Sequence, residues 1–253
     1  MPELLPLPGL STVEGLVHGV TQRAGGVSRG PFASLNLGRS VGDDGDAVTR
    51  NGAILSQVLG AAGRVRFPHQ VHGNAVRVLD AHPEGALGEC DAVATDVPGL
   101  AVGVLGADCP GVLLVDPVHR ALAVVHSGWR GTVAGVVPAA IAALATRFGT
   151  APRDLRVGIG PGISAAAYEV GPEVVEAFRA GFPDATSCVT PGRGDRSWLD
   201  LHGAIRLQLE RAGVPAAAVG VLDLCTHGEP ELFFSHRRDG PRTGRHALVA
   251  MWR

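Results

Sequence analysis

The clearest hydrophobic pattern along the chain is a pair of short apolar runs, residues 111–115 and 121–125, joined by a short proline-containing link. Apolar, β-branched runs on either side of a turn signal predict a β-hairpin. If the turn centres near Val118, opposed residues have numbers that sum to about 236, and Cys109 lies almost opposite His126. The pattern therefore predicts that a thiol and an imidazole lie close together where the two strands end and glycine-containing loops begin.

The rest of the pattern mixes helices and strands without strict alternation. Helices are predicted at 47–59 (ended by Gly60), from Thr132 as N-cap to 148, at 172–180 and at 201–212. Pro138 either kinks the second of these helices or marks the first turn of a later start. Strands are predicted at 64–67, 75–79, 90–95, 100–105, 156–163, 220–224, 232–234 and 246–252. This order predicts an α+β fold in which residues 1–253 form one domain, with mixed β-sheets flanked by helices.

Composition narrows the class of protein. The chain has 253 residues, of which 45% are hydrophobic and 18% charged, as in soluble globular proteins. A net charge of −2 and a pI near 6.5 argue against non-specific binding to nucleic acid or to a membrane surface. All basic residues counted as Lys+Arg are arginine, which excludes lysine Schiff-base chemistry and leaves arginine as the strong anion ligand.

The sequence also predicts a cytoplasmic location. The N-terminal segment has no basic region followed by an apolar one, and no stretch approaches the roughly 18 apolar residues of a membrane span. The four cysteines are scattered, with no CxxC pair, and are expected to be thiols in a reducing compartment.

His72, Cys109 and His126 form a candidate metal site. Three protein ligands leave one coordination position for water or substrate, which is typical of catalytic zinc. The same Cys109 and His126 also fit a cysteine nucleophile with a histidine base, so a cysteine-dependent hydrolase is a second interpretation. A non-enzymatic binding module is a third. Copper is less favoured because the chain lacks an HxH pair and its only methionines are Met1 and Met251.

Two arginine-containing segments are candidate anion sites, although each also fits an ordinary solvated loop. Arg23 and Arg29 flank the glycine-rich residues 25–28, whose backbone is suited to cradling an anion. Near the C-terminus, four arginines fall within nine residues: Arg237, Arg238, Arg242 and Arg245. These side chains repel one another unless an anion or acidic partners lie between them.

Short motifs in a fixed order carry a resemblance to a known family: HGVTQRAGGVSRGPFASLNLG, HQVHG, GADCPGVLLVDP, HSGWRG, GIGPGI with YEVG, and LCT with FFSHRRDG and TGR. The chain resembles the multicopper polyphenol oxidase or laccase-domain family from about His18 to its C-terminus. Members of that family are now regarded as zinc-dependent purine nucleoside phosphorylases with adenosine deaminase activity. Polyphenol oxidation with copper is the older label.

The resemblance implies specific residues and reactions. It places the family's zinc ligands, which are also its catalytic residues, on His72, Cys109 and His126. It points to the following substrate or phosphate contacts: Arg23, Ser28, Asn36, His69, Arg237 and Arg238. The implied substrates are adenosine, inosine and methylthioadenosine, cleaved with phosphate to the free base and (methylthio)ribose 1-phosphate, with adenosine deamination at the same zinc. A monomer or homodimer is expected.

Overall fold

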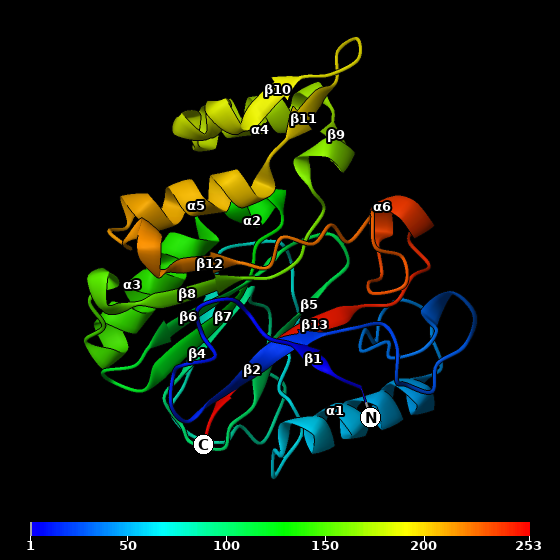
Figure 1. Cartoon of the computed structure of the whole chain (residues 1–253), viewed down its shortest axis with the longest axis vertical. Helices are drawn as coiled ribbons and strands as arrows, with labels where there is room; N and C mark the ends of the chain where they lie inside the picture. Colours follow the sequence, from blue (N-terminus) through cyan, green and yellow to red (C-terminus); the bar gives the residue numbers. More distant parts are fainter. Residues whose placement is uncertain (1) are drawn as a thin grey trace.

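A six-stranded mixed sheet forms the centre of the computed structural model, which describes residues 2–253 (Figure 1). Its strands, in spatial order, are β12 (Val219–Val221), β8 (Arg156–Ile159), β6 (Gly111–Asp116), β7 (Ala121–His126), β4 (Ala92–Thr95) and β3 (Val76–Leu79). The outer pairs, β12 with β8 and β3 with β4, are parallel, and the inner pairs are antiparallel. The predicted hairpin is therefore the middle of this sheet.

A four-stranded sheet packs against one face of the central sheet. Its order is β1 (Leu4–Leu5), β2 (Leu16–Thr21), β13 (His246–Trp252) and β5 (Val102–Gly106). Leu113 and Val124 of the hairpin share a buried cluster with Val104 and Leu248 of this second sheet. Successive side chains of a strand point to opposite faces, so the next residues of the hairpin, Leu114 and Val125, face the other side of the central sheet.

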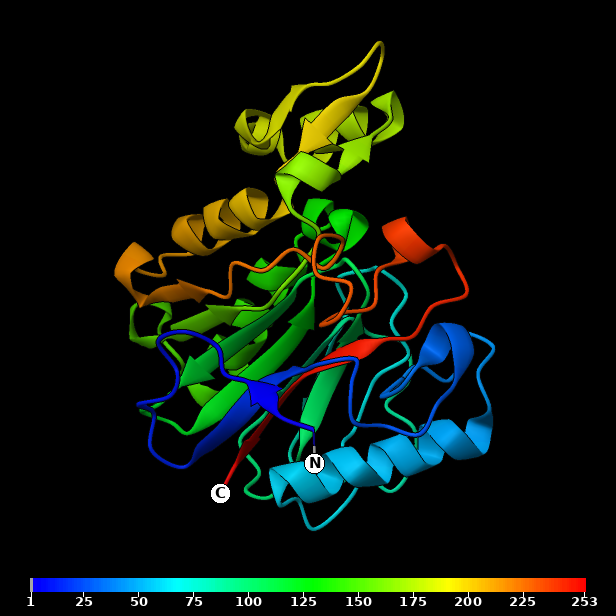
Figure 2. The same cartoon turned by 45° about the vertical axis from the view of Figure 1, so that its right-hand side comes forward.

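Helices cover the two outer faces, which gives four layers (Figures 1 and 2). The helices α3 (Val136–Phe148) and α5 (Leu201–Arg211) pack on the other face of the central sheet, where Leu114 and Val125 are buried. Helix α1 (Gly45–Leu59) packs on the outer face of the second sheet. Because both faces of β6, β7 and β13 are covered, their sequences are continuous apolar runs rather than alternating ones.

A smaller unit projects from the layered body, at the top of Figures 1 and 2. It holds a three-stranded antiparallel sheet, in the order β10 (Val189–Pro191), β11 (Ser197–Leu199) and β9 (Glu169–Val170), with α4 (Pro172–Gly181). Two short helices complete the α-helical elements: α2 (Trp129–Val133) and α6 (His236–Asp239). The 3-10 helices are Gly30–Phe32, Pro152–Asp154, Ala165–Ala167, Pro183–Cys188 and Ala216–Ala218.

The α+β class and most predicted elements are confirmed, but three predictions are wrong. The strand expected at 64–67 is reduced to a single bridge from Arg66 to Val102. Residues 232–234 form no strand, because the apolar side chains there serve core packing: Phe233 and Phe234 are fully buried. A helix starts at Trp129, before the predicted N-cap Thr132.

The break between α2 and α3 explains Pro138. Gly135 adopts φ +78, a left-handed conformation that interrupts the helix and suits glycine. Pro138 then lies in the first turn of α3, where its missing N–H leaves no backbone hydrogen bond unmade. Across residues 2–253, none of the helices has both the length and the apolar character needed to cross a membrane.

Candidate metal centre

The hairpin brings Cys109 and His126 together in a register that differs by one residue from the prediction. His126 ends β7 and pairs with Gly111, so the position facing Cys109 beyond the end of the ladder is Gly128. The sequence predicted that Cys109 lies almost opposite His126, whereas the observed register sums to 237 and places it opposite Gly128. The carbonyl of Pro110 still accepts from the Ser127 N–H at 3.0 Å, so the shift arises at the turn. The two side chains nevertheless meet, since both leave the same end of the hairpin.

Asp91 fixes the orientation of His126. The Asp91 carboxylate is fully buried, and its Oδ1 lies 2.8 Å from Nδ1 of His126. The backbone N–H of His126 also donates to the Asp91 carbonyl, at 2.7 Å. A ring held through Nδ1 presents Nε2 on its opposite side, which is the arrangement that carboxylates impose on metal-binding histidines.

The same carboxylate organises the loop that carries His72. It accepts hydrogen bonds from the backbone N–H groups of Val71 (3.1 Å), His72 (3.0 Å) and Gly73 (2.8 Å). Gln70 ties the loop to β5 through two hydrogen bonds with the Leu105 backbone. His72 itself adopts φ +61, a conformation that is costly outside glycine, and strain of this kind is typical of functional sites.

Cys109 is held by its neighbour Asp108, which adopts φ +98. The Asp108 carboxylate accepts hydrogen bonds from the Thr226 hydroxyl at 2.7 Å and from the backbone N–H of Arg237 at 2.6 Å. Its carbonyl accepts from the Ile163 N–H at 2.8 Å. Three distant segments therefore lock the loop in which the thiol lies.

Gly128 leaves room for the thiol. A Cβ added at this position would lie 2.8 Å from Cys109 Sγ and 3.1 Å from a ring carbon of His72. A separation of 2.8 Å is shorter than side-chain carbons normally adopt, and 3.1 Å is tight. Both atoms belong to members of the ligand group, so relieving the contact would displace that group. The glycine of the HSGWRG motif is therefore required by the approach of the backbone to the site.

Electrostatics favour a thiolate at Cys109. Burial alone would raise the pKa of Cys109, but hydrogen bonds and charge from His126 and His72 outweigh it and lower that pKa. Burial would lower the pKa of His126, whereas Asp91 and Cys109 raise it. The ionised form of cysteine is both the nucleophile and the metal ligand.

The three side chains fit a single metal ion. The ligand atoms of His72, Cys109 and His126 lie within 4.8 Å of one another, and no other such group occurs in residues 2–253. The two imidazole rings meet edge to face, with centroids 4.8 Å apart. Zinc binds Sγ at about 2.3 Å and imidazole nitrogen at about 2.1 Å, so small side-chain rotations bring the three atoms onto one ion. The donor types suit zinc or copper and do not identify the metal.

The predicted contacts of the glycine-rich N-terminal segment are already engaged with the protein. Ser28 donates to Asp43 at 2.6 Å, and Asn36 bonds Asp43 and the backbone of Gly38. The Arg23 guanidinium donates to backbone carbonyls and stacks over Phe234. These bonds hold the segment together, and direct contact of these residues with a substrate stays a prediction.

The two arginines of the FFSHRRDG motif differ sharply. Arg238 makes five hydrogen bonds, to the Asp239 carboxylate and to the carbonyls of Thr226, His227 and Phe233. Arg237 donates to one carbonyl, that of Glu169, and stacks over the Tyr168 ring. His69, with a side chain 74% exposed, faces Glu89 at 3.9 Å and is not among the three grouped ligands.

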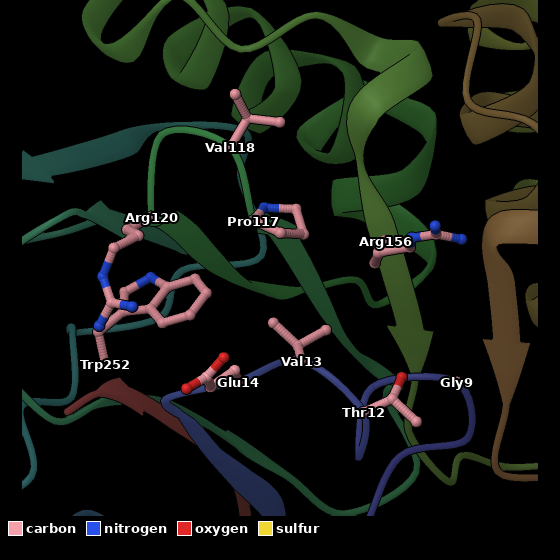
Figure 3. A pocket seen from close by; sticks show the side chains of 9 residues that line it. All are labelled: Gly9, Thr12, Val13, Glu14, Pro117, Val118, Arg120, Arg156 and Trp252. Atoms are coloured by element: carbon pink, nitrogen blue, oxygen red, sulfur yellow. The ribbon is translucent and has the colours of Figure 1, made fainter.

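A cavity lies at the other end of the hairpin, where Figure 3 shows the side chains that line it. It measures about 560 Å³ and is lined by residues of the β6–β7 turn, the loop before β2 and the C-terminal strand. Arg120 lies beside the Trp252 indole there, whereas the Arg156 guanidinium points away from it. The polar groups of this cavity do not converge on a point, and none of the grouped ligands lines it.

Asp91 and Gly128 are the functional positions that sequence reasoning missed. The sequence carries a usable signal for Gly128, because a glycine between His126 and Trp129 permits a close approach of the backbone. Asp91 gives little signal, since an acidic residue before a strand is common and its four hydrogen bonds join segments far apart in the sequence.

Comparisons with known proteins agree with the motifs. Residues 17–253 match the family model described as multi-copper polyphenol oxidoreductase laccase. A protein of Streptomyces coelicolor named purine nucleoside phosphorylase is 44% identical over 237 residues, which cover 92% of this chain and 94% of the relative. One of Bacteroides thetaiotaomicron with the same name is 35% identical, over 96% of this chain and 93% of the relative.

Solved structures extend the match to three dimensions. The crystal structure of YlmD from Geobacillus stearothermophilus superimposes with a TM-score of 0.91 at 36% identity, covering 97% of this chain and 94% of that one. A Bacillus licheniformis hypothetical protein, YfiH, gives a TM-score of 0.92 at 29% identity, covering 99% and 97%. By sequence and by fold, the chain belongs to the multi-copper polyphenol oxidoreductase laccase family.

Proposed function

We propose that this protein is a zinc-dependent purine nucleoside phosphorylase, with His72, Cys109 and His126 as the zinc ligands. The observation that carries the proposal is the group of two imidazoles and one thiol, with Asp91 behind His126, at one end of the hairpin. Relatives at 35–44% identity that are named purine nucleoside phosphorylases support the reaction class. A zinc ion held by three protein ligands supplies Lewis acidity at its remaining coordination position.

The protein's own residues prepare the site. Asp91 holds His126 in the tautomer that frees Nε2, and it fixes the His72 loop through three backbone hydrogen bonds. Gly128 keeps the wall beside Cys109 free of side-chain atoms. Asp91, His126 and Gly128 are buried, and Asp91 holds the exposed His72 loop before substrate arrives, so little reorganisation remains for the reaction itself.

The proposed reaction joins phosphate to the sugar. A phosphate oxygen attacks C1′ of the nucleoside, the bond from C1′ to the base nitrogen breaks, and its electron pair leaves with the base, which takes up a proton. The products are the free base and ribose 1-phosphate, or methylthioribose 1-phosphate from methylthioadenosine. Adenosine and inosine are the other expected substrates. Positive charge develops on the sugar during this step, so a positioned phosphate dianion lowers the barrier.

We further infer that adenosine is deaminated at the same site, where water replaces the C6 amino group and ammonia and inosine are released. The protein is expected in the cytoplasm, as a monomer or homodimer, acting as one domain on small molecules rather than on nucleic acid or membranes. A net charge of −2 supports the last point.

The test is chromatography of inosine, adenosine and methylthioadenosine incubated with the purified protein, with and without phosphate. We expect base release that depends on phosphate, and inosine formation from adenosine that does not. Loss of both activities on chelation, restored by zinc, is the expected metal dependence. Absence of phosphate-dependent base release from all three nucleosides overturns the proposal.

A cysteine-dependent hydrolase is the second candidate, and one observation favours it. The site contains the parts of a catalytic triad: Cys109 as nucleophile, His126 as base and Asp91 as the carboxylate that orients the base. The pKa of the Cys109 thiol is lowered. His72 counts against it, because a triad needs one imidazole beside the thiol, whereas this site has two. Activity that survives metal removal, and that a thiol alkylator abolishes with an adduct at Cys109, would support the hydrolase instead.

A further inference from the structure

The turn of the β6–β7 hairpin carries an apolar side chain that projects into solvent. Val118 is 68% exposed, whereas the other exposed large apolar residues within 2–253, Val27 and Val71, are 40% and 44% exposed. The turn itself is fixed, because the buried Asp116 carboxylate accepts from the Val118 N–H at 2.8 Å and Pro117 restricts the backbone between them. Val118 therefore lies on a rigid support rather than on a loose loop.

Two cavities flank this valine. The first, of about 560 Å³, is the one that Figure 3 shows, beside the loop that leads into β2. The second, of about 360 Å³, is lined by residues 153–155 and by the segment before β12. Pro117, Val118 and Arg156 line both cavities, so the two are continuous around the turn. Val118 and the residues that line the two cavities are called the turn-end surface below.

The apolar part of the turn-end surface is suited to contact with another protein. Pro117, Val118, Pro215 and Ala217 are all exposed. Proline and alanine lose almost no side-chain entropy when they are covered, so burying them costs little order. An apolar centre with charged residues around it is typical of protein interfaces, whereas a small-molecule pocket has polar groups that converge. The turn-end surface matches the first description.

Two charged side chains of this surface lack a partner. The Arg120 guanidinium is engaged by an aromatic ring and a backbone carbonyl, and Arg153 lies 3.9 Å from Asp154. Glu14 and Arg156 are exposed and form no ion pair within residues 2–253. Figure 3 shows them on different sides of the first cavity, with their side chains directed apart. The surface therefore keeps one free negative and one free positive charge.

This pair of charges indicates which partner fits. A partner surface of a single sign brings like charges together at either Glu14 or Arg156, and such contacts are unfavourable. A second copy of the chain, rotated about a two-fold axis, presents the same surface in the opposite direction. Each Glu14 then faces the partner's Arg156, and each Val118 faces a cavity of the other copy. The turn-end surface is thus complementary to itself in shape and in charge.

We propose that the turn-end surface is the interface of a two-fold homodimer. Val118 of each copy fills a cavity of the other, and Glu14 of each copy pairs with the partner's Arg156. The inference goes beyond the proposed function and does not depend on it. None of the three grouped ligands lines either cavity, so the metal centres of both copies stay outside the interface and accessible.

Analytical ultracentrifugation of the metal-loaded protein tests the proposal. We expect the wild-type protein to sediment with twice the chain mass of 26.0 kDa. Glu14→Arg and Arg156→Glu each place like charges at both contacts, so each should raise the dimer Kd by at least about tenfold. An equimolar mixture of these two variants restores opposite charges at both contacts. The mixture should therefore form a heterodimer with a Kd close to that of wild type.

A second set of variants tests the apolar contact. Val118→Asp would bury a carboxylate in a cavity of the partner copy and should shift the mass to that of a single chain. Val27→Asp and Arg193→Glu change exposed residues elsewhere and are the controls, which should remain dimers. Metal content equal to that of wild type in every variant shows that the fold of each chain is intact.

Three outcomes overturn the proposal. One is a wild-type protein that keeps the mass of a single chain at concentrations up to about 100 µM. Another is a dimer that Val118→Asp leaves intact, which places the interface elsewhere. The third is a mixture of the two charge variants that dissociates as readily as either variant alone, which shows that the surface fits a different protein rather than a second copy.

Discussion

The two ends of the β6–β7 hairpin differ in how their polar groups are used. At the turn end, Asp116 accepts from the N–H groups of Val118 and His119 and from the His119 ring, and Arg120 stacks on Trp252 and donates to the Arg253 carbonyl. The polar side chains at this end are therefore hydrogen-bonded to protein groups close by. At the open end, Cys109, His72 and His126 converge, with their ligand atoms within 4.8 Å of one another.

The candidate site is distinguished by the convergence of its polar side chains rather than by the volume of a cavity. The turn end has a cavity of about 560 Å³, yet its polar side chains are engaged locally or point apart. The open end has a cavity of only about 10 Å³ beside Cys109, but it concentrates a thiolate, two imidazoles and a buried carboxylate. Side chains whose pKa values are shifted by several neighbouring groups indicate a functional site better than cavity volume does.

The largest expected effect is at the open end, from Cys109→Ser. A serine hydroxyl stays protonated near neutral pH and binds zinc weakly, whereas the side-chain volume hardly changes. We expect metal content to fall to a small fraction of wild type and activity to fall with it, by at least about 100-fold. The unfolding free energies of the two metal-free proteins should differ by at most about 1 kcal/mol.

Metal analysis and nucleoside assays of the same preparations check this prediction. His69→Ala is the matched control, three residues before His72, and should keep most of its metal. Full metal occupancy in Cys109→Ser, in a preparation whose wild-type counterpart is also fully loaded, contradicts the assignment of the ligand.

The next effect concerns Asp91→Asn. The amide places an N–H group where the carboxylate accepts from four donors, so both the His126 ring and the His72 loop lose their orientation. We expect metal affinity to fall by about 10–100-fold and the unfolding free energy to fall by at least about 2 kcal/mol. Competition with a chromogenic chelator measures the first, and urea unfolding of the metal-free protein measures the second.

Asp96→Asn is the control for that change, because Asp96 is exposed just after the other end of β4. It should leave both quantities unchanged. Equal metal affinity in the wild-type and Asp91→Asn proteins would remove Asp91 from the site.

A smaller and pH-dependent effect is expected at the turn end, from Asp116→Asn. Burial raises the pKa of Asp116, but hydrogen bonds from the His119 ring and from the backbone N–H groups of His119 and Val118 outweigh it and lower that pKa below its ordinary value. A depressed carboxyl pKa contributes stability that is present above the unfolded value, about 3.9, and is lost as pH falls through the folded value. The variant should be less stable than wild type by about 1–3 kcal/mol at pH 7.

Urea unfolding at pH 7 and near pH 3 measures that difference, which should shrink toward the lower pH. Activity at pH 7 should stay within about twofold of wild type, since Asp116 lies at the far end of the hairpin. A stability difference that grows as the pH falls contradicts the assignment.

The smallest expected effect is from Arg120→Ala, which opens the large cavity further. The stacking on Trp252 contributes about 0.5–1 kcal/mol at an exposed site. We expect a fall in unfolding temperature of a few degrees and no change in metal content or turnover. A large loss of nucleoside affinity in this variant would show that the turn end binds substrate, and the contrast between the two ends would break down.

The sequence predicted the elements of the central sheet better than their junctions. Continuous apolar runs identify β6, β7 and β13 because both faces of these strands are covered. The register failed by one residue because it depends on the turn geometry, which a proline-containing link does not determine. The false strand at 232–234 has a different cause, since apolar residues can be buried without pairing in a sheet.

The candidate site was predicted through its ligands but not through its supports. His72, Cys109 and His126 carry distinctive side chains and lie in motifs. Asp91 does not, because its role depends on partners 18–35 residues away in the chain, and such contacts appear only after folding.

The four hydrogen bonds of Asp91 have a consequence for the rate of metal uptake. They hold the His72 loop and the His126 ring in place through protein groups alone, so no segment must fold around the incoming ion. We therefore expect association of zinc with the metal-free protein to be a single fast phase whose rate rises linearly with zinc concentration. Dissociation of the metal ion would have to break its bonds to all three ligands. The rate of that dissociation is therefore expected to determine how long the metal stays bound.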